Sequence, residues 1–121
     1  MSLLSISKNP LSESLQNEYI KDLYRDIVVL PGILQALLFG SAASLTMSDQ
    51  SDMDILLIFD SNENLRLARK KYYSSVGSTK TPRDIIWKTQ DIFNKEKELG
   101  GISMIAFDSG KNILEKYDER S

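Results

Sequence analysis

Apolar residues near the start of the chain recur at every fourth position, which places them on one face of a helix. The residues that keep this spacing are Leu11, Leu15, Tyr19, Leu23 and Ile27. Asn9-Pro10 offers a helix start, because the missing N–H of proline has no partner in the first turn in any case. Pro31-Gly32 offers an end. The pattern therefore predicts one amphipathic helix between these two pairs.

Three short segments further along the chain have the apolar content of strands. They are residues 33–39 (ILQALLF), 53–59 (MDILLIF) and 83–89 (RDIIWKT). Residues 62–75 predict a surface helix, and residues 90–99 predict a polar helix that ends at Gly100-Gly101. Residues 102–108 fit a helix or a strand, and a short terminal element is expected from Ile113. This order predicts an α/β domain, of the α+β kind, with helices packed on a small mixed sheet.

The composition removes several kinds of chemistry. The chain has 121 residues with 15 Lys and Arg against 17 Asp and Glu, a net charge of −2, and neither Cys nor His. Thiolate zinc sites, Ser-His triads and imidazole ligands are therefore excluded, and any proton or metal chemistry must use carboxylates. The length fits a single domain over residues 1–121. The charge does not indicate direct nucleic-acid binding, and no apolar run could span a membrane, so we expect a cytoplasmic protein.

The segment between the first two predicted strands carries the candidate chemistry. The first strand runs into Gly40-Ser41, and the second opens with Asp52-Met53-Asp54. Side chains two apart on a strand share a face, so Asp52 and Asp54 would project together with Cα atoms about 6.5–7 Å apart. Glycine lets a phosphate approach the backbone, and the following N–H groups and the Ser41 hydroxyl can donate to its oxygens.

Topology connects these two motifs. Gly40-Ser41 ends one strand and Asp52 precedes the next, so they meet only if the two strands are antiparallel neighbours. The helix over residues 62–75 then returns the chain, and the third strand would run parallel to the second. This placement would bring Asp84 level with Asp52 and Asp54. The sequence thus predicts a divalent-metal site that handles phosphoryl groups at one sheet edge.

These motifs together resemble the signature of the polymerase-beta-type nucleotidyltransferases. In that signature Gly-Ser is followed after ten residues by Asp-x-Asp, and a later strand carries a further aspartate. The pattern is more specifically similar to the minimal nucleotidyltransferases, which have Gly-Ser-x-Ala-Arg-Gly and then Ser-Asp-x-Asp. The matching positions are Gly40, Ser41, Ala43, Ser51, Asp52 and Asp54, with Asp84 as the third carboxylate. Residues 101–115 resemble the family's C-terminal helix and ending. The likeness covers about residues 30–116 and implies a nucleotidyltransferase fold with a helix over residues 102–109.

This resemblance implies a reaction and roles for the residues. A nucleoside monophosphate, AMP from ATP, would pass to a hydroxyl acceptor. Gly40 and Ser41 would bind the nucleoside triphosphate. Asp52, Asp54 and Asp84 would hold Mg²⁺, or Mn²⁺, in a two-metal site, with Asp84 as general base. Some relatives act as antitoxins that adenylylate a separate helical (HEPN-type) partner, so such a protein is an expected partner here.

One departure from the family pattern leaves a second function open. Ser44-Leu45 stands where the family has Arg-Gly, an arginine that could hold the turn or nearby phosphates. The alternative is therefore a catalytically inactive binding module of the same fold, which neutralises or scaffolds a helical partner.

Simpler interpretations compete for the other polar residues. Asp84 could be a surface carboxylate paired with Arg83 or Lys88. The basic run over residues 66–71 could touch RNA or a partner, although the solvated face of a helix is the simpler interpretation. Trp87 is expected in the core.

Overall fold

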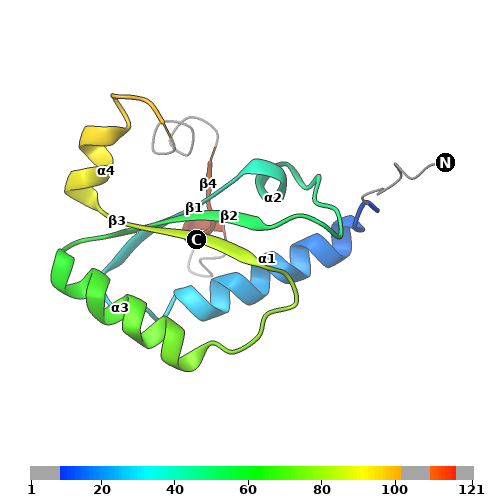
Figure 1. The fold of residues 1–121 in the computed structure, drawn as a ribbon, viewed down its shortest axis with the longest axis horizontal. Coiled ribbons are helices and arrows are strands. Elements are labelled where there is room, and N and C mark those ends of the chain that lie inside the picture. Colours follow the sequence, from blue (N-terminus) through cyan, green and yellow to red (C-terminus); the bar gives the residue numbers. More distant parts are fainter. Residues whose placement is uncertain (1–8, 102–109, 117–121) are drawn as a thin grey trace.

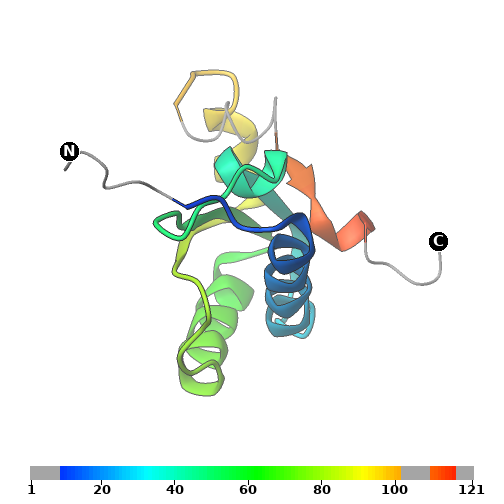
Figure 2. The same ribbon diagram turned by 90° about the vertical axis from the view of Figure 1, so that its right-hand side faces the viewer.

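The chain forms a four-stranded mixed sheet with helices on both sides (Figures 1 and 2). A computed structural model describes residues 9–101 and 110–116. The elements in chain order are α1 (Glu13–Ile27), β1 (Ile33–Phe39), α2 (Gly40–Ser44), β2 (Met53–Phe59), α3 (Asn62–Ser75), β3 (Arg83–Thr89), α4 (Gln90–Glu96), β4 (Lys111–Asn112) and α6 (Ile113–Lys116). The α+β prediction and the bounds of β1, β2, α3 and β3 are confirmed.

Two elements differ from their prediction, and one cannot be compared. The helix α4 ends at Glu96 rather than at residue 99, and the two-residue strand β4 was not predicted. The helix expected over residues 102–109 lies outside the described residues. Within the part of the chain that is described, no helix is long and apolar enough to cross a membrane.

The sheet has the order β3-β2-β1-β4. Strand β1 runs antiparallel to β2, with Phe39 opposite Asp54. Strand β2 runs parallel to β3, with Asp54 opposite Asp84. Both directions confirm the predicted topology, and the register brings the end of β1 and the starts of β2 and β3 to one edge of the sheet.

Each face of the sheet has its own apolar cluster. Helices α1 and α3 lie side by side on one face (Figure 2), where Leu23, Ile27 and Tyr72 pack with alternate residues of β2 such as Ile55 and Phe59. On the other face Leu37, Phe39, Leu56 and Ile58 pack with Phe93 of α4. Asp54 is in phase with Leu56 and Ile58, so it faces away from α1 and α3.

The start of α1 was predicted incorrectly. Its N-cap is Ser12, whose hydroxyl accepts a hydrogen bond from the Leu15 amide, rather than Asn9. Asn9 is bound instead to the loop before β2: its side-chain amide donates to Asp49 Oδ2 over 3.1 Å, and its carbonyl accepts from the Asp49 amide over 2.9 Å. The competing long-range contact therefore removes Asn9-Pro10 from the helix.

The same loop is anchored from α1 by the buried side chain of Gln16, which is 2% exposed. Gln16 Oε1 accepts a hydrogen bond from the Met47 amide over 2.9 Å, and Nε2 donates to the Leu11 carbonyl over 2.9 Å. A buried amide without a partner is costly. Gln16 therefore links α1 to the chain that leads to Asp52.

We expect Gln16→Met to lower the free energy of unfolding by about 2 kcal/mol. Methionine keeps the volume but leaves the Met47 N–H and the Leu11 carbonyl without their partner. Urea denaturation followed by circular dichroism measures the change. Asn17→Met, one position along α1, is the control, and an equal loss in both variants would contradict the anchoring role.

Candidate active site

Two of the three predicted carboxylates are direct neighbours across the sheet. Asp54 on β2 and Asp84 on β3 are register partners in the parallel pair. Asp52 is exposed and lies one residue before β2. Its negative charge is one of the causes that raise the pKa of Asp54.

The Asp54 carboxylate lies against the turn that begins α2. Gly40 has a φ of +68°, and a Cβ at this position would lie 2.6 Å from Asp54 Oδ2. No side chain fits in that gap, and L-residues avoid this backbone region as well. The structure therefore brings the Gly-Ser motif and the second aspartate of Asp-x-Asp together, as the sequence predicted.

The turn itself presents backbone donors. Helix α2 starts at Gly40 and Ser41, and its N-cap residue is Phe39, which supplies no side-chain hydrogen bond. The first N–H groups of a helix lack partners inside the helix. These groups and the half-buried Ser41 thus belong to the turn that begins at Gly40, the residue that Asp54 approaches, and no described side chain caps them.

Ionisation of Asp54 is made costly by its burial and by the two acidic residues near it. Partial burial of Asp54, followed by the negative charges of Asp84 and Asp52, raises the pKa of the Asp54 carboxyl above its ordinary value. A bound cation would relieve this repulsion. In residues 9–101 and 110–116, however, no three acidic side chains converge closely enough to form a ready metal-ligand cluster. A metal would have to draw these carboxylates closer.

Arg83 lies near the site, and the sequence did not predict the contacts that its side chain makes. Its side chain is 5% exposed, and Nη1 donates to Asp26 Oδ2 of α1 over 2.8 Å and to the Tyr72 hydroxyl of α3 over 3.1 Å. Arg83 thereby ties the residue before Asp84 to both helices. Strand alternation was the available signal, because it puts Arg83 and Asp84 on opposite faces.

The structure also shows the contacts of Lys88 and Trp87, the two other residues of β3 for which the sequence offered an interpretation. Lys88 forms an ion pair with Glu96 of α4. Neither Arg83 nor Lys88 pairs with Asp84, which removes the simpler interpretation of that aspartate. Trp87 stacks on Phe59 with ring centroids 5.7 Å apart, so it packs against the core as predicted, although it is only partly buried.

The departure at Ser44-Leu45 has a physical consequence at the end of α2. Leu45 has a φ of 58° and is the only described non-glycine residue with positive φ. The family pattern has glycine here, which adopts this conformation without the strain of about 1–2 kcal/mol that a side chain brings. The Leu45 side chain packs against the main apolar cluster, and this burial offsets the strain. The turn therefore keeps its shape without the family's glycine.

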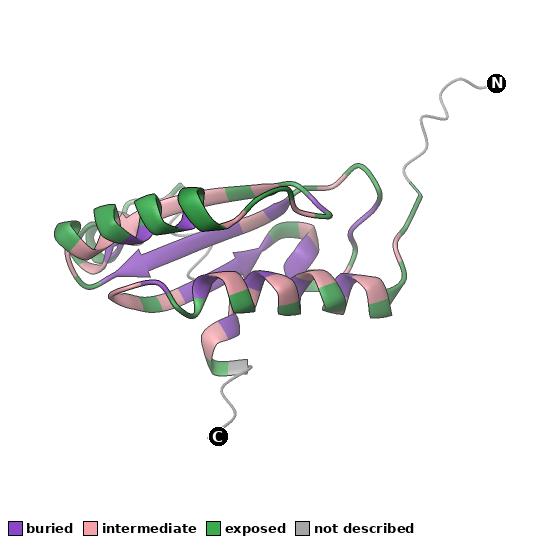
Figure 3. Ribbon diagram, turned by 90° about the horizontal axis from the view of Figure 1, so that it is seen from below, coloured by how far each residue is buried: buried purple, intermediate pink, exposed green. Residues whose placement is uncertain are grey.

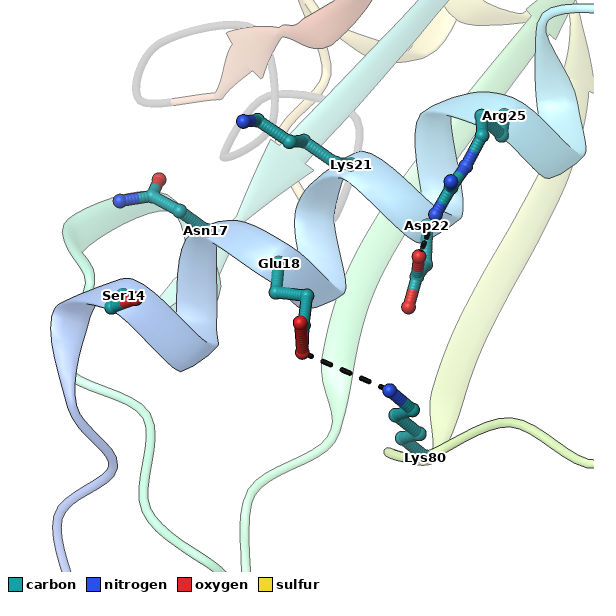
Figure 4. A pocket seen from close by; sticks show the side chains of 7 residues that line it. All are labelled: Ser14, Asn17, Glu18, Lys21, Asp22, Arg25 and Lys80. Atoms are coloured by element: carbon teal, nitrogen blue, oxygen red, sulfur yellow. Dashed lines mark hydrogen bonds and ion pairs between the residues drawn. The ribbon is translucent and has the colours of Figure 1, made fainter.

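One hollow lies away from the carboxylates. It has a volume of about 690 Å³ and lies between α1 and the loop before β3. Figure 4 shows its charged lining, in which Arg25 pairs with Asp22 and Lys80 pairs with Glu18. Because α1 covers the face opposite Asp54, this hollow is separate from the candidate site.

Comparison with known proteins identifies the family. The family model described as "Polymerase beta, Nucleotidyltransferase" matches residues 18–119. The chain therefore belongs to the polymerase-beta nucleotidyltransferase family, and its fold is the nucleotidyltransferase fold. No curated protein and no solved structure matches the chain. Family membership supports nucleotidyl transfer as the general reaction class.

The raised pKa of Asp54 predicts the effect of pH on stability. The folded state prefers the protonated carboxyl, so the stability that this proton confers is present below pH 3.8 and is lost as pH rises through the folded pKa. Asp54→Asn removes the penalty. We expect the variant to melt at a higher temperature than the wild type at pH 7, with the difference shrinking toward zero near pH 3.5.

Thermal unfolding by circular dichroism between pH 3.5 and 8, in the presence of EDTA, measures this difference. Asp84→Asn removes one of the two repelling charges and should give a smaller shift in the same direction. A variant that is less stable than the wild type at pH 7 would contradict the repulsion.

Gly40→Ala tests the close approach of the turn to Asp54. Backbone strain should lower the free energy of unfolding by about 1–2 kcal/mol, and the new methyl group should displace the Asp54 carboxylate. Gly32→Ala is the matched control, because Gly32 has a φ of +72° and its Cβ would also lie under 3 Å from side chains, those of Asn64 and Asp60. Gly32 is at the opposite end of β1. Both variants should lose stability in urea, and only Gly40→Ala should lose nucleotide binding.

Proposed function

We propose that this protein transfers a nucleoside monophosphate, AMP from ATP, to a hydroxyl acceptor. The observation that carries the proposal is the position of Asp54, whose carboxylate lies against Gly40 at the start of α2 and opposite Asp84. This position brings two acidic residues and the turn that would bind phosphate to one edge of the sheet. Membership of the nucleotidyltransferase family supports the same reaction class.

Each residue of the site would have its own role in the transfer reaction. The amides at Gly40 and Ser41 and the Ser41 hydroxyl would donate to the phosphate oxygens of ATP. The acceptor hydroxyl oxygen would form a bond to the α-phosphorus while the bond to the β-phosphate oxygen breaks, so that pyrophosphate leaves. Asp84 would take the hydroxyl proton.

Carboxylate oxygens are the ligands that Mg²⁺ prefers, and the mutual repulsion at Asp54 suits a cation. Asp52, Asp54 and Asp84 would therefore hold Mg²⁺, or Mn²⁺, and the metal would neutralise phosphate charge and lower the pKa of the acceptor hydroxyl. In the described part of the chain the three carboxylates do not yet form a metal-ligand cluster, so they would have to move closer together to bind the ion.

A non-catalytic role is the second candidate function. The replacement of the family's Arg-Gly by Ser44-Leu45 removes a cation near the phosphates, while Leu45 keeps the turn by packing its side chain. A binding module that neutralises a helical, HEPN-type protein would need the fold and not the carboxylates. If the site is active, such a protein is also a fitting hydroxyl acceptor, in the manner of a minimal nucleotidyltransferase antitoxin.

Nucleotide binding distinguishes the two functions without a known acceptor. We expect ATP to bind in the presence of Mg²⁺ and to bind at least tenfold more weakly with EDTA or in Asp52→Asn/Asp54→Asn. Isothermal titration calorimetry with ATP, GTP, CTP and UTP gives the affinities. Asp91→Asn/Glu98→Gln is the control, since it removes the same charge from exposed positions on the α4 side.

An ATP affinity that is the same in the wild type and in Asp52→Asn/Asp54→Asn would overturn the metal-dependent site. No binding of any nucleotide by the folded protein would favour the binding module.

A further inference from the structure

Helix α3 gathers positive charge on its solvent side. Four cations, Arg66, Arg69, Lys70 and Lys71, stand against the single acid Glu63 in a chain whose net charge is −2. Figure 3 shows that most of the helix surface turned away from the sheet is exposed. None of the four pairs with a carboxylate among the described residues, where the ion pairs involve other cations.

The helix itself gives no reason for this cluster. Cations favour the last turn of a helix, where they face the negative end of its dipole, but the last turn of α3 contains none. Arg66 and Lys70 are four residues apart, and like charges at this spacing destabilise a helix slightly. An external anion would remove that repulsion.

Three of the cations share an exposed surface with an aromatic ring. Arg66, Arg69, Lys70, Tyr73 and Ser74 line an open hollow of about 490 Å³. The Tyr73 side chain is 61% exposed, yet its ring is supported from behind. It packs edge-on against Tyr72 at 5.1 Å and lies 6.0 Å from Trp87, measured between ring centroids. One side of the ring is therefore held and the other remains available.

We propose that this face of α3 binds single-stranded nucleic acid. Phosphates would contact the cations, and a base would stack on Tyr73, as in other surfaces that bind single strands through charge and aromatic faces. An acidic peptide would satisfy the cations but would leave the exposed ring without a planar partner. The inference does not depend on nucleotidyl transfer, because α3 covers the face of the sheet opposite Asp54.

Fluorescence anisotropy with a labelled twelve-nucleotide oligo(U) tests the proposal. We expect micromolar binding at 50 mM salt, with log K falling against log salt at a slope of about −2 for three phosphate contacts. Oligo(dT) is the DNA arm. A duplex of the same length should bind at least fivefold more weakly, because its bases cannot stack on Tyr73.

Two variants separate charge from stacking. Arg66→Ala/Arg69→Ala/Lys70→Ala should lose at least tenfold in affinity and most of the salt slope. Tyr73→Ala should lose about tenfold with the slope unchanged. Lys21→Ala/Lys80→Ala/Lys95→Ala removes the same charge elsewhere and should bind like the wild type. Circular dichroism verifies that each variant is folded.

Three results would overturn the proposal. They are no binding at 100 µM protein, an equal loss in the two triple variants, or an affinity for poly-glutamate that equals the affinity for oligo(U) and is unchanged in Tyr73→Ala. The last result would identify the face as a site for an acidic protein.

Discussion

The approach of Asp54 to Gly40 is the constraint on which the rest of the site depends. Antiparallel pairing puts Phe39 opposite Asp54, so the next residue must turn away from the strand directly above a carboxylate. Only a residue without a Cβ fits there, since the Cβ would lie 2.6 Å from Oδ2. The glycine thus serves two purposes at once: it allows the positive φ of the turn and makes room for the acid.

Burial of Asp54 and the charges of Asp84 and Asp52 raise the pKa of its carboxyl, and polar side chains from the other face of the sheet hold the segments that carry these acids. Gln16 holds the loop that leads into β2 through the Met47 amide. Arg83 holds the start of β3 through Asp26 and Tyr72. Both contacts come from the side of the sheet covered by α1 and α3. The acidic edge is therefore positioned by polar groups that a ligand on the opposite face need not touch.

The sequence predicted the features that local patterns control. The strands carrying Asp54 and Asp84 had the expected bounds, because short apolar runs next to turn residues have few alternatives. The start of α1 was wrong, since Asn9 binds Asp49 forty residues away and Ser12 takes the cap. The partner of Arg83 and the short strand β4 could not be predicted for the same reason, as both depend on contacts distant in sequence. The Gly40 contact was predictable because motif and topology agreed.

Net charge was the least informative property of this chain, because it averages over a sheet whose two faces differ. Asp54 and Asp84 meet at one edge and point away from α1 and α3, whereas the cations of α3, which form no ion pair within the described part of the chain, lie on the far side. Each group would be weakened by mixing, since an acid beside Arg66 or Lys70 would neutralise the cation, and a lysine beside Asp54 would compete with a metal. The sheet thus separates the carboxylates of the candidate site from the cations of α3. A total of −2 describes neither group.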